Sequence, residues 1–288
     1  MNISVSFPQY EYSYDPFALK DFIQTIEGLG YSGVLAYDHV LGANPDRPGG
    51  WDGIYTYKHG FLEPFLLFAF WAGMTTKLEF VTGVIILPQR QTALVAKQAA
   101  TLDVLCKGRL RLGVGVGWNK VEYDGLGYDF HKRGRRIEEQ VHLLRKLWTE
   151  PLVTFKGEWD MIPDAGINPL PVQRPIPIWF GGDADVVLQR IAQIGDGWIS
   201  TGTVEETHTA IGKLLSYLLE ENRSKEQVGI EGWLHYGDGN PDTWKRQYED
   251  WKAIGATHIN FSTIESGLPT PQAHLDAMML FAETIGLS

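Results

Sequence analysis

The chain has 288 residues, of which 44% are hydrophobic and 21% are charged. This hydrophobic content is ordinary for a globular protein and excludes a disordered chain. The formal net charge of −10 argues against nucleic acid or an anionic membrane surface as a partner.

The start of the chain, Met1–Ser4, lacks the basic residues and the apolar run of a secretion signal. The chain has no stretch of about eighteen consecutive apolar residues, so no transmembrane helix is predicted. The single cysteine, Cys106, excludes an intrachain disulfide, and free thiols are typical of a reducing compartment. We therefore expect a cytoplasmic protein.

Apolar, β-rich segments alternate with helical patterns from one end of the chain to the other. The eight predicted strands are Ile3–Phe7, Val34–Tyr37, Leu78–Ile86, Leu110–Val114, Pro177–Phe180, Gly197–Ser200, Gly229–His235 and His258–Ser262. Between them apolar residues recur with the period of a helix. Eight strands, each followed by a helix, predict an α/β fold: one (β/α)8 TIM-barrel domain over residues 1–288.

Two longer stretches interrupt this pattern. Leu41–Phe61, after the second strand, is rich in Gly and Pro and contains Trp51, Tyr55 and Tyr57. Those aromatic residues either contact an apolar substrate or pack the loop against the barrel. The second insertion, Glu150–Arg174, precedes the fifth strand. Long loops in compact domains are usually functional or mobile.

A small hairpin is predicted within the second insertion. Its arms are Val153–Phe155 and Glu158–Met161, and its turn is centred on Gly157.

Active sites of such barrels lie at the C-terminal ends of the strands. Here these ends carry mostly glycine and aromatic residues: Phe7-Pro8, Asp38-His39, Gly83-Val84, Gly115–Asn119, Gly181-Gly182, Thr201-Gly202, His235-Tyr236 and Thr263. These strand ends contain neither a His-x-His pair nor converging carboxylates, so we predict no metal site. A second glycosidase acid and a G-x-S-x-G serine are also missing. By elimination, the site suits a cofactor that carries the chemistry itself.

The fourth strand ends in glycines at every second position: Gly113, Gly115 and Gly117, followed by Trp118 and Asn119. Glycine weakens a strand, so a series of them indicates close approach of another group, such as a flat cofactor ring. A bulged strand tip is the alternative. The spacing differs from that of a dinucleotide fingerprint and of a P-loop.

Gly181 and Gly182 end the fifth strand, and Asp183 is predicted to cap the helix that runs to Ile194. Backbone N–H groups at a helix start bind anions, so we expect a cofactor phosphate here, with Thr201 as a further donor. Ordinary β-to-α turn chemistry is the alternative.

Seven motifs in register resemble the bacterial luciferase-like superfamily of flavin and deazaflavin oxidoreductases. They are Leu35–His39, Thr82–Pro88, Ala96–Leu105, Gly108–Asn119, Arg133–Glu139, Pro177–Gly182 and Gly195–Thr201. The resemblance runs from about Ile3 to Gly202 and fades after that. Within the superfamily, Asp38-His39 resembles the branch that uses coenzyme F420, the 5-deazaflavin.

The resemblance implies roles for several residues. His39 is expected to be the proton donor or acceptor near the reactive carbon, and Asp38 to contact the cofactor. Hydride transfer leaves a proton to be moved, and histidine titrates near neutral pH. A structural hydrogen bond under the loop is the alternative for His39. A non-prolyl cis peptide, Gly83–Val84, is expected behind the ring, and the family implies a homodimer.

One position departs from the pattern of the family's sugar-phosphate dehydrogenases. In those enzymes a glutamate that serves as general acid follows the glycines of the fourth strand, and by resemblance Trp118 takes its position here. The resemblance therefore favours a small apolar or aromatic substrate over a sugar phosphate.

Three functions remain open. The first is an F420-dependent oxidoreductase that transfers hydride. The second is an FMN-dependent monooxygenase of the same fold that uses reduced flavin and O2. The third is a flavin-binding barrel without catalysis.

Overall fold

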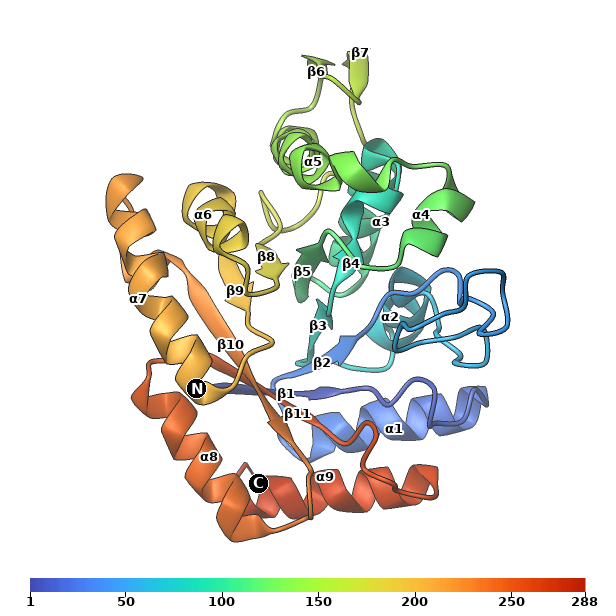
Figure 1. Ribbon diagram of the computed structural model, residues 1–288, viewed down its shortest axis with the longest axis vertical. Helices are drawn as coiled ribbons and strands as arrows, with labels where there is room; N and C mark the ends of the chain where they lie inside the picture. Colours follow the sequence, from blue (N-terminus) through green and yellow to red (C-terminus); the bar gives the residue numbers. More distant parts are fainter. Residues whose placement is uncertain (288) are drawn as a thin grey trace.

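The computed structural model describes residues 1–287, which form a closed parallel barrel surrounded by helices (Figure 1). Its strands are β1 (Asn2–Ser6), β2 (Gly33–Ala36), β3 (Glu79–Thr82), β4 (Ile85–Ile86), β5 (Leu110–Gly115), β8 (Ile178–Gly181), β9 (Gly197–Ile199), β10 (Gly229–His235) and β11 (His258–Ser262). Their order in the sheet is β3-β2-β1-β11-β10-β9-β8-β5, and pairing of β3 with β5 closes the ring. The predicted (β/α)8 barrel is confirmed.

The helices are α1 (Pro16–Gly28), α2 (Pro64–Ala72), α3 (Thr92–Leu105), α4 (Lys120–Leu126), α5 (Arg133–Thr149), α6 (Asp185–Ile194), α7 (Val204–Glu220), α8 (Pro241–Ala253) and α9 (Pro271–Ile285). Four of them begin with proline directly after a capping side chain: Asp15, Glu63, Asn240 and Thr270. Proline has no N–H to lose at this position, and the cap accepts a bond from a free N–H of the first turn. These helix starts are therefore encoded locally.

The N-terminal end of the barrel interior is filled by a buried ion-pair network. Arg111 donates to Glu231 over 2.7 Å and to Glu79 over 3.0 Å, and its guanidinium lies 4.2 Å from the centre of the Trp179 ring. Ser4 adds a bond to Glu231 at 3.1 Å. Because this end is filled, the space for a ligand lies at the opposite, C-terminal end.

A bulge separates β3 from β4. Phe80 pairs with Leu110 and Ile85 pairs with Val114, so five positions on one strand match four on the other. Such an extra residue redirects the strand at its end, which is common beside active sites.

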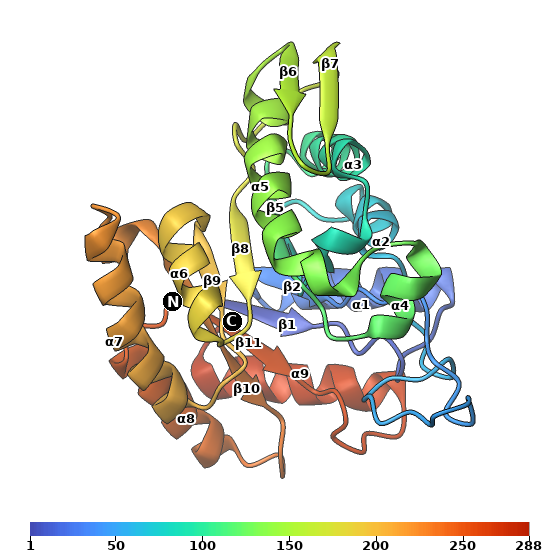
Figure 2. The same cartoon turned by 45° about the horizontal axis from the view of Figure 1, so that its top comes forward.

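The predicted hairpin is present as β6 (Val153–Lys156) and β7 (Met161–Ala165), which project beyond α5 in both views (Figures 1 and 2). The predicted second arm, Glu158–Met161, is wrong, because β7 begins only at Met161. Glu139 accepts bonds from the backbone amides of Glu158, Trp159 and Asp160 and so holds them in the turn.

Among the described residues, no helix combines the length and the apolar character needed to cross a membrane.

Candidate active site

A cavity of about 590 Å³ opens at the C-terminal ends of the barrel strands, and we call it the barrel cavity. Its volume is in the range of small-molecule sites. Nine predicted site residues line it: Asp38, His39, Gly83, Val84, Gly115, Gly117, Trp118, Gly181 and Thr201. The other lining residues are Tyr37, Ile54, Tyr55, Ile86, Val116, Trp233 and His235. The structure thus brings together residues from strands far apart in the sequence.

The peptide bond Gly83–Val84 is cis, as predicted. Val84 follows it and explains the glycines on the neighbouring strands. A Cβ atom at Gly115 would lie 2.6 Å from Val84 Cγ2, and one at Gly181 would lie 2.9 Å from Val84 Cγ1. A side chain of the protein therefore approaches these two glycines, which themselves line the cavity, and their contact with a cofactor stays a prediction. Val84 itself lines the cavity.

His39 lies just beyond β2 with 12% of its side chain exposed. Its ring centre is 4.8 Å from those of Tyr55 and Phe61 and 5.8 Å from that of Trp118. Its Nδ1 atom is 3.4 Å from Oε2 of Glu122. The imidazole therefore lies among three aromatic rings, with a carboxylate next to one of its nitrogens.

Glu122 was not predicted as a site residue. It lies in the first turn of α4, and its side chain is 1% exposed. The sequence contains a signal, since Asn119 and Glu122 have the spacing of a capping box. That motif predicts a bond from the glutamate to its own helix start, whereas the structure directs Glu122 to the end of β2.

Asp38 is also buried, and its oxygens already have partners. Oδ1 accepts from Arg90 Nη2 at 2.8 Å, and Oδ2 accepts from Arg90 Nε at 3.3 Å and from the Ile86 amide at 3.1 Å. Arg90 also donates to Glu63 at the start of α2. Burial lowers the pKa of Arg90, but the two carboxylates outweigh it and raise that pKa, so Arg90 stays charged. Asp38 thus fixes the bulge to β2, and its contact with a cofactor stays a prediction.

Two predicted cofactor residues, Asn119 and Gly182, do not line the barrel cavity. Asn119 is buried, and its Oδ1 caps α4 by accepting from the Val121 amide at 3.0 Å. The amide of Gly182 donates to the carbonyl of Ile199 at 3.3 Å.

The predicted N-cap Asp183 is wrong, because α6 begins at Asp185 and Ala184 is the residue before it. The carboxylate of Asp183 turns to the end of β9 instead. There it accepts from the amide and hydroxyl of Thr201 and from the hydroxyl of Ser200. A phosphate at this place would therefore meet a carboxylate that already uses the Thr201 donors. The cavity walls suit a flat, mainly apolar ring. The expected phosphate site, in contrast, is available only if the carboxylate of Asp183 releases the donors of Thr201.

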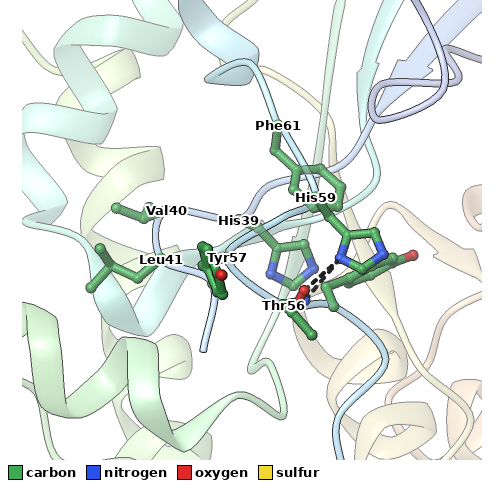
Figure 3. A pocket seen from close by; sticks show the side chains of 9 residues that line it. His39, Val40, Leu41, Thr56, Tyr57, His59 and Phe61 are labelled. Atoms are coloured by element: carbon green, nitrogen blue, oxygen red, sulfur yellow. Dashed lines mark hydrogen bonds between the residues drawn. The ribbon is translucent and has the colours of Figure 1, made fainter. Parts of the chain in front are cut away.

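A second cavity of about 330 Å³ lies under the loop after β2, and Figure 3 shows its lining side chains. His39 and Tyr55 line both cavities. His59 helps to hold the loop, since its Nδ1 accepts from the Thr56 amide at 3.0 Å.

The loop aromatics divide between the two roles left open by the sequence. Tyr55 lines the barrel cavity. Trp51 packs near Trp118, with ring centres 5.8 Å apart, and its indole N–H donates to the Tyr55 carbonyl at 2.9 Å. Tyr57 lines only the second cavity and is 61% exposed.

A family model described as "Luciferase-like monooxygenase" matches residues 4–251. The match continues past Gly202, where the sequence motifs fade. An uncharacterized protein of Mycobacterium tuberculosis is 39% identical over 181 residues, which cover 61% of this chain and 62% of that protein. A pyrimidine monooxygenase of Pseudomonas savastanoi is 28% identical over 76% of this chain and 59% of its own length. The chain thus spans about three fifths of the length of these curated relatives.

Two solved structures share the fold over 99% of this chain and 98% of theirs, each at 17% identity. One is a monooxygenase from Streptomyces bottropensis, with a TM-score of 0.81. The other is an F420-dependent secondary alcohol dehydrogenase in complex with an F420-acetone adduct, with a TM-score of 0.78.

Proposed function

Since the chain belongs to the luciferase-like monooxygenase family, we propose that it is an oxidoreductase whose cofactor is the deazaflavin F420. The observation that carries this proposal is the barrel cavity itself. Of its two histidines, His39 and His235, His39 is held by Glu122 and lies with the cis bulge at Gly83–Val84 in the lining, and the other walls are mostly apolar. The pair Asp38-His39 favours the deazaflavin over FMN through its resemblance to the F420-using branch.

When bound, F420 would supply hydride chemistry at its carbon five. The residues that would hold its ring are those of the bulge, Val84 and Ile86, and the glycine strand end at Gly115 and Gly117. His39 would move the proton that accompanies hydride transfer, the ordinary task of a general acid or base.

The cavity favours a small apolar or aromatic organic substrate. Ile54, Tyr55, Trp118 and Trp233 all line it, and Trp118 is 42% exposed. The lining carboxylate of Asp38 is already bound to Arg90, and the large apolar side chains favour neutral molecules over sugar phosphates.

An FMN-dependent monooxygenase is the second candidate. The curated relative named as a pyrimidine monooxygenase supports it, because it matches three quarters of this chain. The two cofactors share a planar tricyclic ring, so the shape of the cavity separates them poorly.

Fluorescence titration of the purified protein with F420 and with FMN separates the candidates. We expect F420 to bind at least about tenfold more tightly than FMN. Turnover is then followed by the absorbance of F420 with a panel of small apolar and aromatic carbonyl compounds. In His39→Ala, turnover should fall by about 10²–10⁴-fold while F420 affinity changes far less.

Tighter binding of FMN, together with O2-dependent turnover, would replace the first proposal by the second. Binding of either cofactor without turnover across the panel would favour a flavin-binding barrel without catalysis.

A further inference from the structure

We infer that Glu122 is a positioning residue that fixes the orientation and the tautomer of His39. This inference rests on the proposed role of His39 in proton transfer. The geometry is a carboxylate oxygen 3.4 Å from His39 Nδ1, contributed by the helix that follows the glycine-rich strand.

The carboxylate is itself rigidly held. Its Oε1 atom accepts from the backbone amides of Val40 at 2.7 Å and Leu41 at 3.1 Å, the residues directly after His39. Asn119, at the start of the same helix, donates to the Leu41 carbonyl at 3.3 Å. The first turn of α4 therefore fixes both the histidine and the beginning of the loop that covers it.

Glu122 is ionised at neutral pH. Burial raises the pKa of its carboxyl, but the hydrogen bond and charge of His39 and the two amide bonds outweigh burial, so this pKa lies below its ordinary value. An ionised carboxylate can only accept hydrogen bonds. His39 Nδ1 must therefore donate to it, and in the neutral imidazole the proton resides on Nδ1.

The other ring nitrogen, Nε2, is then the atom that can accept or deliver a proton. Within residues 1–287 the structure assigns no hydrogen-bond partner to it, while the ring lines the barrel cavity. A buried carboxylate that accepts from one nitrogen of a catalytic histidine leaves the other nitrogen free for proton transfer in the same way.

The other titratable groups around His39 do not compete for Nδ1. Asp38 is bound to Arg90. Burial raises the pKa of Tyr55, so its hydroxyl stays neutral. His59 shares the second cavity with His39 and is bonded through its own Nδ1 to Thr56.

The test is long-range ¹H–¹⁵N NMR of the imidazoles in the cofactor-free protein, with the His39 signals assigned from a His39→Asn variant. In the wild type we expect the Nδ1–H tautomer. In Glu122→Gln the side-chain amide donates to Nδ1, so the tautomer should change to Nε2–H.

Asp124→Asn is the matched control. It removes the same charge from the same helix, but Asp124 is 59% exposed in its side chain and pairs with Lys120. We expect unchanged His39 signals in this variant. Glu122→Asp keeps the charge and should keep the Nδ1–H tautomer, which provides a second test if Glu122→Gln fails to fold.

An Nε2–H tautomer in the wild type, or the same tautomer in Glu122→Gln as in the wild type, would overturn the inference. Because the measurement needs neither cofactor nor substrate, its outcome is independent of the cofactor titration. If F420 does bind and turn over, Glu122→Gln should lower kcat, with F420 affinity nearly unchanged.

Discussion

At the residue scale, two carboxylates beside the barrel cavity differ in the groups that hold them. Asp38 is buried against the charged guanidinium of Arg90 and is neutralised by it. Asp183 is exposed and accepts only from neutral donors of Ser200 and Thr201. Its charge therefore remains uncompensated at the place where the sequence predicts a phosphate.

Asp183→Asn should consequently tighten the binding of a phosphate-bearing cofactor. Removing one negative charge at an exposed site should lower the Kd of F420 or FMN by about two- to fivefold. The measurement is the fluorescence titration described above. Asp185→Asn, which removes a charge two residues further along the chain at a carboxylate bonded to Tyr217, should leave the Kd unchanged. An unchanged Kd in Asp183→Asn would show that the phosphate lies elsewhere, and weaker binding would contradict the predicted repulsion.

At the element scale, the bulge between β3 and β4 explains why neighbouring strands need glycine. Val84 extends toward two strands at once, toward Gly115 on β5 and Gly181 on β8. Gly117 has the same relation to Ile86, whose Cγ2 would lie 2.7 Å from an added Cβ. The glycine pattern in the sequence thus records the packing of a neighbouring strand.

Gly115→Ala should destabilise the fold by about 1–3 kcal/mol, the usual cost of overpacking. In a Val84→Ala background the same substitution should cost much less, because the γ carbon that it meets is gone. Chemical denaturation of the four proteins in this cycle measures the coupling. Gly212→Ala on α7, where an added Cβ meets nothing within 4 Å, should not destabilise and is the control. Equal costs in both backgrounds would contradict the contact.

At the scale of the whole molecule, two histidines away from the barrel cavity link folding to pH. His274 on α9 is fully buried and bonds through Nδ1 to the Thr263 hydroxyl at 2.8 Å. Burial lowers the pKa of His274 to about 4. Burial, followed by the charge of Arg111, likewise lowers the pKa of His258 to about 4.

These shifts predict a loss of stability in mild acid. Between pH 6.5 and about 4 the unfolded chain binds a proton at His274 and the folded protein does not, so the free energy of unfolding falls as pH falls. Each group should contribute about 1–3 kcal/mol over that range. Urea denaturation at pH 7 and pH 5 measures the difference, and it should be smaller in His274→Gln. An unchanged pH dependence in that variant would rule out this assignment.

The surface formed by α1 and α2 leads us to propose that two copies of the chain associate there. The segment Pro64–Ala72 is apolar on all sides, yet Leu66 is 72% exposed, and on α1 Phe17 is 76% exposed. A helix that is apolar all round is normally covered on all sides, and a two-fold contact would cover this one with its own copy.

Leu66→Glu should therefore convert a dimer to a monomer in light scattering after gel filtration. Leu219→Glu on α7 changes an equally exposed leucine, 76% exposed, and should leave the dimer intact. A monomeric wild type, or a dimer that survives Leu66→Glu, would contradict this interface.

The sequence by itself determined the order of strands and helices, the barrel and nine of the residues around its cavity. Apolar runs such as Gly229–His235 and caps such as Asn240 act over a few neighbouring residues, so they can be recognised without the fold. The resemblance to the family predicted the place of His39 and the cis bond at Gly83–Val84, because matching motifs indicate matching positions in the fold.

Only the tertiary structure decided which side chains meet across the barrel. Glu122 and His39 are 83 positions apart, and Glu139 holds a turn about twenty residues further along the chain. Asp183 faces Thr201 and does not cap its own helix. Glu122 and Asp183 each had a local capping role available, and all three carboxylates accept from donors on another element. The free energy of a hydrogen bond depends on distance and burial in the folded protein, which no local pattern specifies.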